Sequence, residues 1–319
     1  MALSKSSVKV PAGVPDSVHG TYTGNFLAIT RGSGNLMLFA GDQKVEHLNE
    51  DFYGSGIAED DGDPEHLFRI AAGAEIGAFA SQLGLISLYG RDYAAVNYIV
   101  KLNSKTPLVG TTLRDPLSRQ WVDVDQVMDL KRDAGLSIAG VGYTIYLGSE
   151  FETEMLYEAA QIIHRAHRFG LVTVLWIYPR GRAVGNEKDP ALIAGACGVA
   201  ACLGSDFVKV NYPEQEGARP EDIFRPAVRA AGRCGVVCAG GSSTDVRSFL
   251  TRLRQQIFVS GARGNATGRN VHQKPLEEAI RMCNAISAIT IKGMSVDQAM
   301  AVYAGETPLV LEGYGAGVH

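Results

Sequence analysis

Two lysines of this 319-residue chain lie in apolar segments, where an ammonium group is costly to bury. Lys209 occurs in VKVNYP (208–213) and Lys101 occurs in YIVKLN (98–103). Burial and a neighbouring cation both lower the pKa of an amine, and the neutral amine is the form that attacks a ketone. Lys209 is therefore a candidate nucleophile. Lys101 is either its rival or the second cation that keeps Lys209 neutral. Alternatively, the lysine stem lies along the strand while the ammonium reaches solvent.

An aromatic pair occurs in LWIYPRG (175–181). Strand alternation points Trp176 and Tyr178 to the same side. The phenol of Tyr178 beside an iminium could move protons on and off carbon and oxygen. The alternative is an aromatic pair that only fills space, and Arg180 is a possible supporting residue.

A carboxylate follows another apolar segment, in FAGDQKVEH (39–47). Asp42 could take the proton from a sugar hydroxyl while the adjacent carbon–carbon bond breaks, or it could cap the next turn. His47 is a weaker candidate, because a loop histidine is more often solvated.

Two glycine-rich turns are suited to phosphate binding. They contribute Gly240, Gly241 and Ser242 from AGGSST (239–244), and Gly268 and Arg269 from TGRN (267–270). Backbone N–H groups in such turns bind anions, and an arginine adds a charge-assisted hydrogen bond.

The elements that must position these residues alternate along the chain. Seven apolar segments are typical of strands: 36–42, 77–81, 98–103, 138–146, 171–179, 205–213 and 235–241. For the eighth strand we prefer 263–268 over the more apolar 256–260, because the helix 245–260 then has a normal length. Strands that alternate with helices predict a parallel sheet, here a (β/α)8 TIM barrel, with the candidate residues at the carboxyl ends of the strands. We predict one barrel domain over 34–319, preceded by an N-terminal extension over 1–33.

Two of the helices have clear signals. In 151–170, five apolar side chains fall on one face at steps of three and four, and Gly170 ends the helix: Met155, Ala159, Ile162, Ile163 and Ala166. In 189–204, Asp189 is the expected N-cap and Pro190 the first helical residue.

Composition excludes several classes of function. The net charge of -4 gives no reason to expect a nucleic-acid or anionic-membrane partner, and no apolar run is long enough to span a bilayer. The first 20 residues have no apolar signal-peptide core, so we expect a cytoplasmic protein. The five cysteines have an odd number and no zinc-ribbon or CxxC spacing, which predicts buried free thiols.

Neither a metal nor a cofactor is expected. His164 and His167 are three residues apart on a predicted helix, but we place them on its solvent-facing stretch without a third ligand. The sequence has no P-loop and no nucleotide-binding GxGxxG after a strand.

Several motifs in order resemble the archaeal-type class I fructose-bisphosphate aldolases, over residues 36 to 290. They are VGYTIYLGSEFE (141–152), LWIYPRG, VKVNYP, AGGSST and TGRNVHQ (267–273). The resemblance implies that Lys209 forms the Schiff base, Tyr178 is the proton donor and acceptor, Trp176 shapes the site and Asp42 handles the hydroxyl proton. It also implies that Gly240, Gly241, Gly268 and Arg269 bind phosphate, and that the chain forms a homo-oligomer, commonly a decamer.

The implied reaction is the reversible cleavage of fructose 1,6-bisphosphate to dihydroxyacetone phosphate and glyceraldehyde 3-phosphate, in glycolysis and gluconeogenesis. Two departures stand out: Gln43-Lys44 where many relatives have His-Gly, and the polar RGNATG (263–268) in the eighth strand. Related transaldolase- or thiolase-type enzymes acting on another sugar phosphate remain an alternative, although Trp176 favours the fructose-bisphosphate branch. A catalytically inert barrel that binds sugar phosphates is a further alternative.

Overall fold

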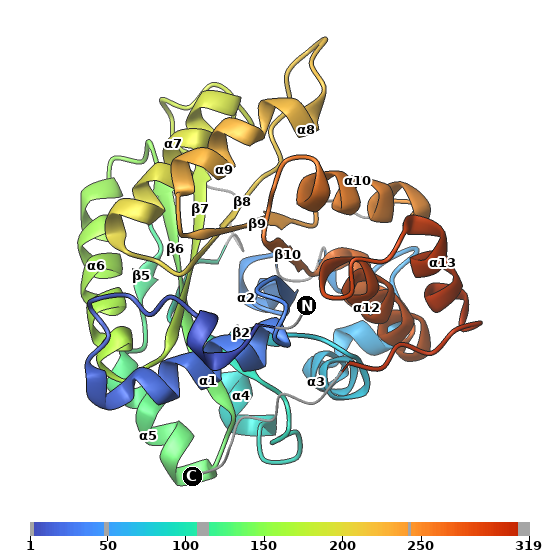
Figure 1. Ribbon diagram of the computed structural model, residues 1–319, viewed down its shortest axis with the longest axis horizontal. Helices are drawn as coiled ribbons and strands as arrows, with labels where there is room; N and C mark the ends of the chain where they lie inside the picture. The colour runs from blue at the N-terminus through green and yellow to red at the C-terminus, as the bar shows by residue number, and fades with distance from the viewer. Residues whose placement is uncertain (1–2, 48–50, 107–114, 242–243, 312–319) are drawn as a thin grey trace.

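The structure is a computed structural model that describes residues 3–47, 51–106, 115–241 and 244–311. Eight parallel strands close into a barrel in the order β1-β10-β9-β8-β7-β6-β3-β2, which confirms the predicted (β/α)8 fold (Figure 1). The strands are β1 (Leu36–Ala40), β2 (Ala78–Gln82), β3 (Tyr98–Lys101), β6 (Ile138–Leu147), β7 (Val172–Pro179), β8 (Phe207–Val210), β9 (Gly235–Ala239) and β10 (Gly264–Thr267). A short antiparallel pair, β4 (Asn103–Ser104) and β5 (Arg119–Gln120), follows β3.

Helices surround the barrel and cover its outer face (Figure 1). They are α1 (His19–Thr30), α2 (Gln43–Glu46), α3 (Pro64–Gly73), α4 (Leu83–Tyr89), α5 (Val124–Ala134), α6 (Glu152–Arg168), α7 (Pro190–Leu203), α8 (Pro220–Ile223), α9 (Arg225–Ala231), α10 (Val246–Phe258), α11 (Arg269–His272), α12 (Leu276–Thr290) and α13 (Val296–Ala304). Short 3-10 helices occupy Lys5–Ser7, Asp16–Val18 and Glu59–Gly62.

The helix signals in the sequence are confirmed. The Asp189 side chain accepts hydrogen bonds from the backbone N–H groups of Ala191 and Leu192, and Pro190 is the first residue of α7. The predicted apolar face of α6 is buried. Gly170 has a φ of 69°, a left-handed conformation that favours glycine just past a helix end.

The eighth strand is β10, as preferred, and 256–258 belong to the end of α10. Its polar side chains are tolerated in the barrel because they bond to buried partners. Asn265 donates to Thr290 Oγ1 at 2.9 Å, and Thr267 donates to Asn265 Oδ1 at 3.0 Å.

Two cores hold the barrel together. One fills its interior with side chains that include Leu38, Val174, Phe207 and Val237, and the other lies between the strands and the surrounding helices. Inward side chains of alternate strands thus form a packed interior, as is usual for this fold.

The N-terminal extension packs against the amino-terminal ends of the strands. Tyr22 of α1 donates a 2.6 Å hydrogen bond to Asp206, just before β8, and Phe26 stacks on Phe207 at 5.7 Å. Its division from the barrel as a separate unit stays a prediction.

Two sequence predictions about individual side chains are wrong. His167 is buried, because its Nε2 pairs with Asp206 at 3.0 Å, while His164 is exposed as expected. Cys202 is exposed, whereas the other four cysteines are buried free thiols.

Candidate active site

A cavity of about 130 Å³ lies at the carboxyl ends of the barrel strands. The predicted residues that line it are Asp42, His47, Trp176, Tyr178, Arg180, Lys209, Gly240, Gly241, Gly268 and Arg269. Lys101 lies beside the cavity lining, in contact with Asp42 and Trp176. Ser242 falls outside the described residues.

Three buried ionisable side chains, Asp42, Lys101 and Lys209, lie at or beside this cavity. Lys101 at the end of β3 donates to Asp42 Oδ2 at 3.3 Å, and both side chains are buried. Burial works to raise the pKa of Asp42, but the ammonium groups of Lys101 and Lys209 overcome it and hold that pKa below its ordinary value. Asp42 is therefore ionised at neutral pH. Its backbone carbonyl accepts a 2.9 Å hydrogen bond from Gln82, which fixes the turn after β1.

The surroundings of Lys209 favour the neutral form of its amine. Burial lowers its pKa, and the charge of Lys101 lowers it further, while Asp42 opposes both effects. A lowered pKa gives a larger share of neutral amine near neutral pH.

Trp176 lies between the two lysines. Its ring is 4.8 Å from Lys101 Nζ and 5.5 Å from Lys209 Nζ, measured to the centroid. Trp176 and Lys209 are direct partners in the β7–β8 register. The indole needs the space left by Gly142 on β6, because a Cβ there would lie 2.4 Å from the ring.

Two tyrosines lie on neighbouring strands, closer to the carboxyl ends of those strands than Trp176. Tyr178 on β7 and Tyr146 on β6 are partners in the strand register, with ring centroids 6.4 Å apart. Burial raises the pKa of both phenols well above the ordinary value. The carboxylates of Asp42 and Glu46 raise the pKa of Tyr178 further. Both phenols are therefore protonated and able to donate. Sequence reasoning gave Tyr146 no role, although its register with Tyr178 follows from the strand alignment.

The two glycine-rich turns lie side by side above β9 and β10. Asn270 joins them: its Oδ1 accepts from the Thr244 backbone at 3.1 Å, and its Nδ2 donates to Gly240 O at 3.3 Å. A Cβ on Gly240 would lie 2.9 Å from the Thr267 side chain, so the close approach of the turns requires glycine. Asn270 was missed because its partners are distant in sequence.

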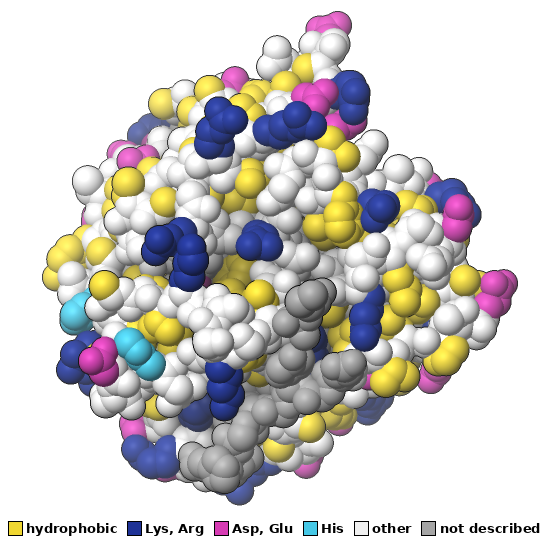
Figure 2. Space-filling view, in the orientation of Figure 1, with side chains coloured by type: hydrophobic (Ala, Val, Ile, Leu, Met, Phe, Trp, Pro, Cys, Tyr) yellow, Lys and Arg dark blue, Asp and Glu magenta, His cyan; other side chains and the backbone are white. Residues whose placement is uncertain are grey.

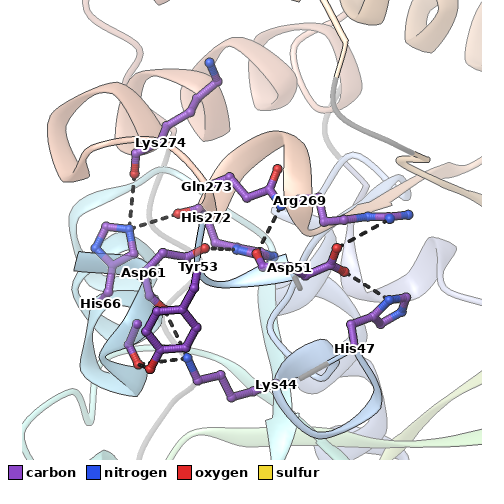
Figure 3. A network of polar contacts seen from close by, with 11 residues as sticks. Lys44, His47, Asp51, Tyr53, Asp61, His66, Arg269, His272, Gln273 and Lys274 are labelled. Atoms are coloured by element: carbon purple, nitrogen blue, oxygen red, sulfur yellow. Dashed lines mark hydrogen bonds and ion pairs between the residues drawn. The ribbon is translucent and has the colours of Figure 1, made fainter. Parts of the chain in front are cut away.

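Arg269 reaches the cavity beside an acidic residue. Its Nη1 lies 3.7 Å from Asp51 Oδ1, and Asp51 pairs with His47 at 3.0 Å (Figure 3). Burial works to raise the pKa of Asp51, but His47 and Arg269 hold it below the ordinary value. Among the described residues the guanidinium thus makes a long ion pair with Asp51, which an incoming anion can replace.

Further charged residues surround the cavity on the side of β6 and β7. Arg180 pairs with Glu187 through two contacts of 2.6 and 2.7 Å. Glu46 lines the cavity with a buried Oε1 that has no hydrogen-bond partner among the described residues. Glu46 and Asn211 also line the site and were not predicted.

Larger cavities, of about 560 and 470 Å³, lie at the amino-terminal ends of the strands, and no predicted site residue lines them. Figure 2 shows Lys and Arg side chains around a hollow on the face that carries α1.

Within the described ranges, no group of three or more His, Cys, Asp or Glu side chains is arranged to hold a metal ion. No helix in the same ranges is long and apolar enough to cross a membrane.

The chain has relatives among known proteins. Residues 36–274 match the model of the DeoC/LacD family aldolases. The chain belongs to this family.

The relatives of this DeoC/LacD-family aldolase include archaeal proteins of nearly the same length. It is 59% identical to a Methanocaldococcus jannaschii protein named "Fructose-bisphosphate aldolase/6-deoxy-5-ketofructose 1-phosphate synthase", over 95% of this chain and 97% of the relative. It is 32% identical to the "Fructose-bisphosphate aldolase class 1" of Thermoproteus tenax, over 88% of this chain and 98% of the relative. The resemblance to archaeal-type class I aldolases is thereby confirmed.

Solved structures of this family superpose closely. A fructose-bisphosphate aldolase from Slackia heliotrinireducens has a TM-score of 0.96 and 52% identity, and the match covers 99% of this chain and 100% of the other. An archaeal fructose-1,6-bisphosphate aldolase, described with its catalytic Lys bound to the carbinolamine intermediate of the substrate, has a TM-score of 0.72 and 34% identity. That match covers 85% of this chain and 99% of the other.

Proposed function

We propose that this family member is a Schiff-base-forming aldolase that reversibly cleaves fructose 1,6-bisphosphate, with Lys209 as the nucleophile. The observation that carries the proposal is the state of Lys209: it is buried, its pKa is lowered, and it shares a cavity with Asp42 and Tyr178. The glycine-rich turns and Arg269 in the same cavity support a phosphorylated substrate. Relatives named fructose-bisphosphate aldolase support the same chemistry.

The proposed reaction assigns one task to each group. The neutral Lys209 amine adds to the C2 carbonyl of the ketose, and uptake of one proton with loss of the oxygen as water gives an iminium; the later hydrolysis of the iminium returns that proton. The C3–C4 bond then breaks, its electron pair moves into an enamine, and the C4 hydroxyl proton goes to Asp42 as C4 becomes an aldehyde. Tyr178 delivers a proton to C3, and water hydrolyses the iminium to release dihydroxyacetone phosphate. The proton that Asp42 takes balances the one that Tyr178 gives.

A second activity is the synthesis of 6-deoxy-5-ketofructose 1-phosphate, which the double name of the M. jannaschii relative suggests. This ketose shares the dihydroxyacetone phosphate half, but its other half is an unphosphorylated 2-oxo-aldehyde. Two observations favour such an acceptor: Lys44 is bound by backbone carbonyls outside the cavity lining, and Arg180 is already paired with Glu187. Neither cation is therefore free to bind a second phosphate.

The test is covalent trapping. The protein is incubated with dihydroxyacetone phosphate and borohydride, and the modified residue is identified by peptide mass spectrometry in wild type, Lys209→Met and Lys101→Met. We expect the adduct on Lys209, its loss in Lys209→Met, and turnover that survives EDTA. An adduct on Lys101 with Lys209 unmodified would overturn the assignment. No adduct at all would support an inert sugar-phosphate-binding barrel. Comparing kcat/KM for cleavage of fructose 1,6-bisphosphate and of 6-deoxy-5-ketofructose 1-phosphate then decides which acceptor aldehyde the protein uses.

A further inference from the structure

Gln43, the residue after Asp42, packs directly on one of the glycine-rich turns. A Cβ added to Gly268 would lie 2.3 Å from Gln43 Nε2 and 2.6 Å from its Oε1. The glutamine amide therefore occupies the space that any side chain at position 268 would need. Gln43, Gly268 and Arg269 line the same cavity, together with Gly240 and Gly241 of the other turn.

The acceptor of this amide, Gln43 Oε1, is buried and is left without a hydrogen-bond partner among the described residues. A primary amide carries two donors and an acceptor, and a buried polar atom without a partner is unfavourable. Rotation of the amide can turn either its oxygen or its nitrogen to the cavity. The group is therefore suited to a ligand with both hydroxyl donors and anionic acceptors, such as a phosphorylated ketose.

Lys44, the residue after Gln43, anchors α2 to the segment around Asp61. Its Nζ donates to the backbone carbonyls of Asp61 and Gly62 at 3.0 and 2.9 Å, and lies 4.0 Å from the centroid of the Phe52 ring. Figure 3 shows Lys44 and His47 leaving α2 in different directions, Lys44 toward Tyr53 and His47 toward Asp51. Because α2 has four residues, such an anchor outside the helix fixes where Gln43 points.

The anchor continues to the element that carries Arg269. Phe52 stacks on His272 of α11 with ring centroids 4.7 Å apart, and His272 Nδ1 pairs with Asp61 at 2.7 Å. His272 and Asp61 are both fully buried. One packed group thus holds Gln43 and Arg269 in fixed relative positions.

We propose that Gln43 binds the phosphate on the ketose half of the substrate, beside Arg269 and the two glycine-rich turns, and so selects phosphorylated over unphosphorylated ketoses. The inference rests on the proposed function, because it takes the ketose to be bound at Lys209. A neutral amide suits this position, since a carboxylate there would add a second negative charge next to Asp42 and would repel the phosphate.

The test compares two ketoses that differ by the phosphate alone. The concentration dependence of borohydride trapping at Lys209 is measured with dihydroxyacetone phosphate and with dihydroxyacetone, for wild type, Gln43→Ala and Gln43→Glu. In Gln43→Ala we expect apparent affinity for the phosphorylated ketose to fall about ten- to a hundredfold, because hydrogen bonds to charged groups are worth about 1.5–3 kcal/mol. Gln43→Glu should lose more. Affinity for dihydroxyacetone should stay the same in both variants.

Val45→Ala is the matched control, because Val45 lies on the same short helix and does not line the cavity. It should change neither affinity. Equal losses for the two ketoses in the Gln43 variants would mean that Gln43 supports the fold and would overturn the inference, as would no loss at all. Failure of wild type to form an adduct would instead refute the proposed function. Calorimetric binding of inorganic phosphate to wild type and Gln43→Glu would then still decide the role of Gln43, with equal affinities overturning it.

Discussion

The two buried lysines differ in what they contact. Lys101 hydrogen-bonds to Asp42, whereas Lys209 lines the cavity and faces the space where a ketose would lie. The sequence shows two lysines in apolar strands and leaves open which is the nucleophile, because the register of the barrel decides which one reaches the cavity. The geometry favours Lys101 as the cation that tunes its neighbour. The neighbouring lysines hold the pKa of Asp42 below its ordinary value, and burial holds the pKa of Lys209 below its ordinary value.

Lys101→Met is expected to shift the pH dependence of Schiff-base formation to higher pH. Lys209 then loses a repelling cation and keeps the attraction of Asp42, so its pKa rises and less neutral amine is present at neutral pH. Each unit of pKa increase leaves about tenfold less neutral amine. The measurement is the initial trapping rate at saturating dihydroxyacetone phosphate from neutral to alkaline pH. Lys101→Arg keeps the cation and should keep the profile. A profile that moves to lower pH in Lys101→Met would contradict the tuning role.

At the scale of elements, local patterns predict most of the fold. Strand and helix positions, the α7 cap and even the polar β10 follow from spacing along the chain. Contacts between segments that are distant in sequence cannot be predicted from such local patterns. His167 is buried because Asp206, 39 residues away, supplies its partner, and Gln43 is a site residue because it meets Gly268 across the β1–β10 junction. The sequence shows Gln43 only as a departure from the motif and His167 only as a helix residue, because the partner of each lies far along the chain.

Lys44→Met should both loosen the fold and weaken substrate binding, because it keeps the stem against Phe52 but removes the ammonium from two carbonyl oxygens. We expect the free energy of unfolding to fall by about 1–3 kcal/mol, the usual cost of unsatisfied buried groups. KM for the phosphorylated ketose should rise, and Lys44→Arg should restore part of the lost affinity. Urea unfolding and steady-state kinetics give the two values. Lys292→Met, at an exposed lysine, should change neither. Loss of stability with an unchanged KM would show that Lys44 does not position the site.

At the scale of the whole molecule, the two ends of the barrel have separate tasks. The carboxyl ends of the strands carry the cavity, and α1 covers the amino-terminal ends through Asp206. The Asp206 carboxylate accepts from Tyr22, from His167, and from both the backbone N–H and the hydroxyl of Thr173, at 2.6 to 3.0 Å. The homo-oligomeric assembly stays a prediction.

Asp206→Asn should therefore lower stability without changing the chemistry. We expect the free energy of unfolding to fall by about 1.5–3 kcal/mol, because the amide removes a charge from several hydrogen bonds. Denaturant unfolding measures this loss, and trapping at saturating dihydroxyacetone phosphate under native conditions should match wild type. Asp16→Asn alters a fully exposed carboxylate and serves as the control. Slower trapping by folded Asp206→Asn would show that the two ends are coupled.

The position of Trp176 between two lysines has an optical consequence. The chain has two tryptophans: Trp176, which is buried against Lys101 and Lys209, and Trp121, which is 51% exposed. Indole emission responds to charges near the ring, and a cation over its face interacts directly with the π-system. Under the proposed function, conversion of a neutral Lys209 amine into an iminium would place a positive charge next to Trp176, while Trp121 lies at the surface. Formation of the proposed Schiff base should therefore change the emission of Trp176, so the covalent step can be followed by fluorescence without an added label.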